Sequence, residues 1–376
     1  MPVYLDHNAT TPLDPRVLEA MQPYLAGPAA NASSLHRYGR RARHAVEAAR
    51  QQVADLVGAT PAEVIFTSGG TEANNLALKG VLAAAGGGLA YGATEHPAVM
   101  EAAESLRATH PVSVIPVDGG GAVDPLALQT LLQQARPRLV SLMCANNETG
   151  VIQDLPRLAP LIQAAGAWLH VDAVQAAGKL PIERETLGAD LLTLSSHKLY
   201  GPQGVAALVV RAEVPLAAVQ QGGAQEKARR GGTENVAAIV GFGLAAELAK
   251  SEQDQRRAQL APLIARLDEG LARLPGVVVF GHGRPRLANT RQFALPGWDG
   301  EALLMALDRR GFAVSSGSAC ASGSGEPSHV LLAMGHDRVT AKGAVRVSLG
   351  RDNRPEHIEQ LLAALTELAA VPGAVA

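Results

Sequence analysis

Residues 139–172 read LVSLMCANNETGVIQDLPRLAPLIQAAGAWLHVD. The apolar run at 139–145 predicts a buried strand, the stretch at 156–165 predicts a helix, and residues 168–171 predict a second strand. Strands that are apolar throughout, rather than alternating, are typical of a parallel sheet that helices cover on both faces. This strand–helix–strand unit therefore predicts an α/β fold.

The same alternation continues in both directions from this unit. Short apolar runs predict further strands at 64–67, 89–91, 112–116, 191–194 and 205–210. Helical spacing predicts helices at about 37–57, 71–82 and 97–108, and another that begins at 124–125. Strands that alternate with helices in this way predict a large domain, which we place at residues 15–250, built on a mostly parallel seven-stranded sheet.

A long helical stretch at about 235–274 leads out of this sheet, and its polar middle is typical of a solvated connector. Beyond it we expect helices and four short strands, at 277–280, 290–295, 313–315 and 345–349. These elements predict a smaller α+β domain made of residues 1–14 and 251–376. A chain of 376 residues has the length of two domains.

Composition excludes several classes of protein. Hydrophobic residues make up 47% and charged residues 18% of the chain, which excludes a mainly disordered protein. A net charge of −2 and an aromatic content of 3% argue against nucleic-acid binding. Because we find neither a long apolar run nor a signal-peptide pattern, and only two cysteines, we expect no membrane span and a cytoplasmic location.

Ligand sites in such sheets lie beyond the carboxyl ends of the strands, and polar residues follow three of the predicted strands. They are Thr71, which follows Gly70 at the predicted start of a helix, together with Asp172, Gln175, Ser195, His197 and Lys198. Taken singly, each has an ordinary explanation, such as a capped turn or a surface lysine. Together they offer helix N–H groups for a phosphate, a carboxylate for a ring nitrogen and an amine for an aldehyde. These are the needs of pyridoxal phosphate.

Histidines and cysteines supply further candidates. His96 could stack on a cofactor ring or simply cap the helix that follows it. Cys320 lies in a run of small residues, which favours a reactive thiol over a packed one. Cys144 ends an apolar strand and His170 lies inside one, so both are expected in the core. No histidines have the spacing of metal ligands, so we expect no metal site.

Nine segments of the chain, taken in order, resemble the cysteine desulfurases. They are residues 4–12, 31–36, 66–75, 94–99, 146–150, 195–204, 230–233, 315–322 and 345–350. The sequence SSGSAC at 315–320 is similar to the NifS/IscS branch of that family. Where the family usually has glycines, this chain has Ala224 and Ala228.

The resemblance implies a fold-type I, pyridoxal-phosphate-dependent homodimer that converts L-cysteine to L-alanine. Lys198 would bind the cofactor covalently, Cys320 would take the sulfur as a persulfide, and Arg346 would pair with the substrate carboxylate. Thr233 would reach the phosphate bound in the partner subunit. The other roles implied are Asp172 at the ring nitrogen, Gln175 at the ring hydroxyl, His96 stacked on the ring, Asn147 beside it, and Gly70, Thr71, Ser195 and His197 at the phosphate.

The resemblance also implies a protein that accepts the sulfur from the enzyme. An iron–sulfur scaffold or a tRNA-thiolation protein would fill that role. The alternatives are a selenocysteine lyase, another lyase or transferase on the same scaffold, or a binding protein that has lost catalysis.

Overall fold

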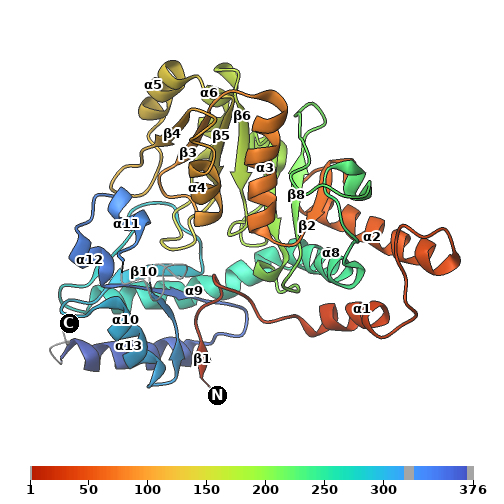
Figure 1. Ribbon diagram of the computed structural model, residues 1–376. Coiled ribbons are helices and arrows are strands. Elements are labelled where there is room, and N and C mark those ends of the chain that lie inside the picture. The colour runs from red at the N-terminus through yellow and green to blue at the C-terminus, as the bar shows by residue number, and fades with distance from the viewer. Residues whose placement is uncertain (1, 317–325, 371–376) are drawn as a thin grey trace.

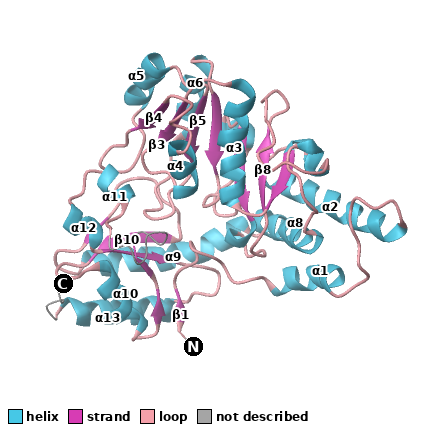
Figure 2. Cartoon of the chain, viewed as in Figure 1, coloured by secondary structure: helices cyan, strands magenta, loops and turns pink. Residues whose placement is uncertain are grey.

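The computed structural model describes residues 2–316 and 326–370, and its centre is a seven-stranded sheet (Figures 1 and 2). The strands are β2 (Val64–Thr67), β3 (Leu89–Gly92), β4 (Val112–Ile115), β5 (Leu139–Met143), β6 (Trp168–Asp172), β7 (Leu191–Ser195) and β8 (Ala206–Val210). Their order is β2-β8-β7-β6-β5-β3-β4, and all neighbours are parallel except β8, which is antiparallel to β2 and β7. The predicted, mostly parallel sheet is confirmed.

Helices cover both faces of this sheet, which explains why its strands are apolar throughout. In β2, Ile65 packs into a core with α3 (Gly70–Ala85) and α4 (Pro97–Glu104). Its neighbours Val64 and Phe66 pack into the core on the opposite face. The helices of that face are α1 (Pro15–Leu25), α2 (Arg37–Leu56), α5 (Pro125–Ala135), α6 (Leu155–Ala164) and α8 (Val236–Ser251); the short α7 (Arg184–Leu187) lies between β6 and β7 in the chain.

The long helical stretch expected at 235–274 is two helices, α8 and α9 (Gln253–Ala272), which meet at Glu252. Glu252 leaves helical geometry there, with φ −100° and ψ 3°. Its carboxylate is paired with Arg16 at 2.6 Å and Arg256 at 2.8 Å. These ion pairs fix the junction against α1, whose first residues include Arg16.

The rest of the chain forms a second group of elements with a core of its own, seen in the lower left of Figure 1. A four-stranded sheet has the order β12 (Ser315–Ser316), β13 (Ala344–Ser348), β10 (Thr290–Ala294) and β9 (Val278–Val279). Beside it, β1 (Val3–Tyr4) pairs with β11 (Phe312–Ala313). The helices here are α9, α10 (Gly300–Asp308), α11 (His329–Ala333), α12 (Arg338–Lys342) and α13 (Pro355–Ala369).

The N-terminal segment joins this second group, because Leu5 packs in its core with residues of α9 and α13. The segment then crosses toward the central sheet, where Thr11 bonds to His197. The division of the chain into domains at residues 14 and 250 stays a prediction. In the described part of the chain, no helix combines the length and the apolar character needed to cross a membrane.

Candidate active site

A cavity of about 300 Å³ lies at the carboxyl ends of β5, β6 and β7. Its walls include every predicted site residue that the structure describes, apart from Thr233. These residues are Gly70, Thr71, His96, Asn147, Asp172, Gln175, Ser195, His197, Lys198 and Arg346. Thr233 is exposed and does not line this cavity. Its role at the phosphate site of a partner subunit stays a prediction. Cys320 lies outside the described residues.

Lys198 comes directly after β7, at the end of the 3₁₀ turn Ser196–Lys198. Its Nζ donates hydrogen bonds to the main-chain oxygens of Asn8 at 2.5 Å and Ala9 at 2.7 Å. Both acceptors belong to the N-terminal segment, about 190 positions away in the chain. The amine is therefore held in the cavity by a segment that crosses from the other group of elements.

Asp172 ends β6 and places a buried carboxylate in the cavity. Oδ2 accepts a hydrogen bond from Asn74 Nδ2 at 2.8 Å, and Oδ1 accepts one from the Val174 N–H at 3.0 Å. A buried carboxylate needs such donors, and it is the natural partner for a cationic ring nitrogen.

Two imidazoles line the cavity. His96 caps α4, because its Nδ1 accepts a hydrogen bond from the Ala98 N–H at 3.1 Å. The same side chain also lines the cavity. Burial lowers the pKa of His96. Burial and the charge of Lys198 lower the pKa of His197 to about 4. At neutral pH both rings are therefore uncharged, which suits stacking and neutral hydrogen bonding.

The N-terminus of α3 provides donors for an anion. The first N–H groups of a helix have no acceptor within it, and Gly69 at the cap has no side chain to occupy them. Gly70 lets this end pack closely against the residues that follow β6, since a Cβ there would lie 3.3 Å from Val174 Cγ2. Thr71 and Ser195 add hydroxyl groups to the same cavity. The arrangement suits a phosphate.

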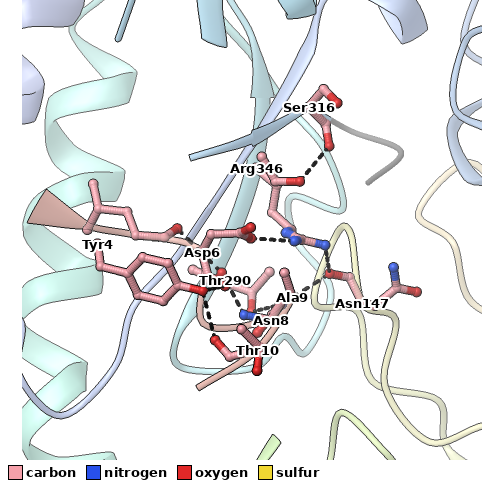
Figure 3. Close-up of polar contacts among 12 residues, drawn as sticks. Tyr4, Asp6, Asn8, Ala9, Thr10, Asn147, Thr290, Ser316 and Arg346 are labelled. Carbon is pink, nitrogen blue, oxygen red and sulfur yellow. Dashed lines mark hydrogen bonds and ion pairs between the residues drawn. The ribbon is translucent and has the colours of Figure 1, made fainter. Parts of the chain in front are cut away.

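Arg346 lies on β13 and its side chain is only 1% exposed. Figure 3 shows its guanidinium directed toward Asp6 and Asn147. Its guanidinium donates to Asp6 Oδ1 at 2.6 Å and to the main-chain oxygen of Asn147 at 3.1 Å. Its buried Nε has no hydrogen-bond partner among the described residues. A buried N–H with no acceptor is costly, and a substrate carboxylate in the cavity would supply one.

The residues present fit pyridoxal phosphate. The cavity brings together the Lys198 amine, the Asp172 carboxylate and the donors at the start of α3, and Arg346 still has an unsatisfied N–H. The two residues expected in the core are indeed buried. His170 lies between the hydroxyls of Ser141 and Thr193, and burial, together with the charge of Asp172, raises the pKa of the Cys144 thiol to about 12.

Of the other residues that line the cavity, Asn8, Ala9 and Asn74 bond directly to Lys198 or Asp172 and were not singled out from the sequence as site residues. Asn74 follows Gly70 by four positions, so it lies on the same face of α3, and that spacing could have identified it. Asn8 and Ala9 belong to the segment 4–12, which resembles the family, but no local pattern places that segment beside Lys198.

The chain is similar to known proteins over nearly its whole length. The model of the aminotransferase class-V family matches residues 3–361. A cysteine desulfurase of Sinorhizobium fredii is 46% identical over 96% of this chain and 95% of its own length. A cysteine desulfurase IscS of Anaeromyxobacter is 44% identical over 98% of this chain and 92% of its own. The structure of a NifS-like protein from Rickettsia africae superposes with a TM-score of 0.91 at 36% identity, covering 99% of this chain and all of the other.

Proposed function

The chain belongs to the class-V aminotransferases and within them is a pyridoxal-phosphate-dependent cysteine desulfurase, and from that premise we propose how its residues divide the work of the reaction. The observation that carries the proposal is the meeting of Lys198, Asp172 and Arg346 on one cavity. These residues come from two different strand ends of the central sheet and from a strand of the second group.

Bound pyridoxal phosphate supplies an electron sink that weakens the bonds at the substrate Cα. Lys198 would bind the cofactor aldehyde, and Asp172 would hold the ring nitrogen in its protonated form. The N–H groups at the start of α3, with Thr71, Ser195 and His197, would hold the phosphate.

Lys198 also has the position of a proton carrier. When its amine is not joined to the cofactor, the main-chain oxygens of Asn8 and Ala9 hold Nζ in the cavity. From there Nζ takes the proton from the substrate Cα and returns it later. Arg346 binds the substrate carboxylate and so fixes which substrate bonds face Lys198.

Cys320 would accept the sulfur. Its thiolate attacks the substrate sulfur, and the C–S bond breaks as the S–S bond forms. The electron pair of the broken bond stays with the substrate carbon, which takes a proton, so the products are L-alanine and a persulfide on Cys320. In this proposal the enzyme acts as a cytoplasmic homodimer in which Thr233 completes the partner's phosphate site. The persulfide then passes to an acceptor protein, such as an iron–sulfur scaffold.

The two cysteines allow a direct test. The protein is incubated with L-cysteine, alanine is measured, and the peptides are examined by mass spectrometry for one added sulfur on Cys320. We expect Cys320→Ala to bind the cofactor but to form neither alanine at the normal rate nor the persulfide. Cys144→Ala is the matched control and should keep both. Full activity of Cys320→Ala would contradict the proposal.

A further inference from the structure

Lys179 lies beside the active site, and the proposed function gives it no role. Its Nζ donates hydrogen bonds to Gln175 Oε1 at 2.8 Å and to Asn8 Oδ1 at 3.0 Å. The side chain lines a second cavity, of about 50 Å³, that it shares with Lys198. Enclosing one lysine next to another costs free energy, and the hydrogen bonds of Nζ offset part of that cost.

Gly178 brings this lysine into position. Its φ of +70° is in the left-handed region that favours glycine. A Cβ at this position would lie 2.7 Å from Leu199 Cδ2 and 3.1 Å from Ala249 Cβ. The turn can therefore pack between the segment that carries Lys198 and helix α8 only with glycine there.

The contacts of Gln175 fix the orientation of its amide. The Asn8 main-chain oxygen can only accept, so Gln175 presents Nε2 to it, at 2.9 Å. Its Oε1 then faces Lys179 and accepts the hydrogen bond from Nζ. The second hydrogen of Nε2 remains. Gln175 lines the active-site cavity, so the group it can offer there is an N–H donor and not an acceptor.

Asn8 is held in the same way. Its Oδ1 accepts from Lys179, and its Nδ2 donates to the main-chain oxygen of Asn147 at 3.0 Å and to Thr290 Oγ1 at 2.8 Å. The main-chain oxygen of Asn8 accepts from both Lys198 and Gln175. Lys179 thus contacts the two residues that hold the groups around the Lys198 amine.

We propose that Lys179 is a positioning residue that fixes the Gln175 amide, and with it Asn8, so that Gln175 donates a hydrogen bond to the ring oxygen of the cofactor. The inference rests on the proposed function. Burial and the charges of Lys198 and Arg346 lower the pKa of Lys179 well below its usual value. Charged or neutral, the amine keeps at least two N–H donors, so both hydrogen bonds persist.

The test follows the visible absorption of the Lys198-bound cofactor as a function of pH. A donor to the ring oxygen stabilises its anionic form, so losing the donor should raise the apparent pKa of the absorption change. For Lys179→Met we expect a rise of about half a pH unit or more, the shift that one ordinary hydrogen bond produces. Lys250→Met, on α8 and far along the chain, is the control and should titrate like the wild type.

A double-mutant cycle shows whether Lys179 acts through Gln175. In a Gln175→Leu background, Lys179→Met should lose at least half of its effect on the apparent pKa. An equal shift in both backgrounds would overturn the inference, as would a Lys179→Met titration that matches Lys250→Met. If Lys179→Met does not fold, Lys179→Gln should give a smaller shift of the same sign, and no shift would again refute the inference.

Borohydride reduction of each variant separates this inference from the proposed function. A pyridoxyl group on Lys198 in the wild type together with an unchanged titration in Lys179→Met refutes only the role of Lys179. Absence of the label in the wild type refutes the proposed function itself.

Discussion

Glu226→Gln should destabilise the protein severely, because Glu226 is one half of a buried ion pair. Its side chain is 2% exposed and that of Arg50 is 4% exposed. The two groups meet through paired hydrogen bonds of 2.7 and 2.9 Å, and Glu226 also accepts from the Phe66 N–H at 2.9 Å. Glutamine leaves the guanidinium without its buried counter-charge and turns an N–H group toward the N–H groups of Arg50.

Breaking a buried pair in this way costs about 3–5 kcal/mol, which is a large part of the stability of an ordinary domain. Glu47 provides a matched control, since it also pairs with Arg50, at 3.1 Å, but its side chain is 55% exposed. An exposed pair contributes about 1 kcal/mol or less. Glu47→Gln should therefore have a small effect.

Urea unfolding of the two variants, followed by circular dichroism, measures the difference. We expect Glu226→Gln to lose at least about 2 kcal/mol more unfolding free energy than Glu47→Gln. Equal losses would refute the reasoning.

Three further results are expected. Ala228 has a φ of +60°, where a Cβ costs about 1 kcal/mol, so Ala228→Gly should raise the melting temperature by about 1–2 °C; Ala224→Gly, where φ is −80°, should not. Burial lowers the pKa of His170 to about 4, so the unfolded chain binds a proton first as the pH falls below 6.5. The contribution of His170 to the unfolding free energy is therefore complete above pH 6.5 and falls by up to about 3 kcal/mol toward pH 4. The urea midpoint should fall less steeply with decreasing pH for His170→Gln than for the wild type, and equal slopes in the two proteins would contradict this. Arg346→Lys should raise the KM for L-cysteine about 10- to 100-fold in steady-state assays while Lys198 still binds cofactor, because an ammonium cannot form the paired contact with a carboxylate; an unchanged KM would remove Arg346 from the substrate site.

The sequence predicts the central sheet well because its signals are local. Apolar runs locate the strands, and capping residues such as Asp124 locate the starts of helices. The rule that ligands bind beyond the carboxyl ends of parallel strands then predicts from the sequence alone that Asp172 and Lys198 lie at the same edge of the sheet.

Long-range packing explains what the sequence does not predict. Asn8 reaches the cavity only because Leu5 is anchored in the second core and Thr11 bonds to His197. Lys179 gains its contacts from a turn whose path depends on Gly178 packing against Leu199. Neither position has a local pattern that distinguishes it from an ordinary loop residue.

Reduction of the cofactor-loaded protein with borohydride, followed by peptide mass spectrometry, tests the central claim most directly. We expect one pyridoxyl group per chain, on Lys198, and none on Lys179 despite its place beside the same cavity. A label on any other lysine, or no label at all, would contradict the assignment of this cavity as the site of pyridoxal phosphate.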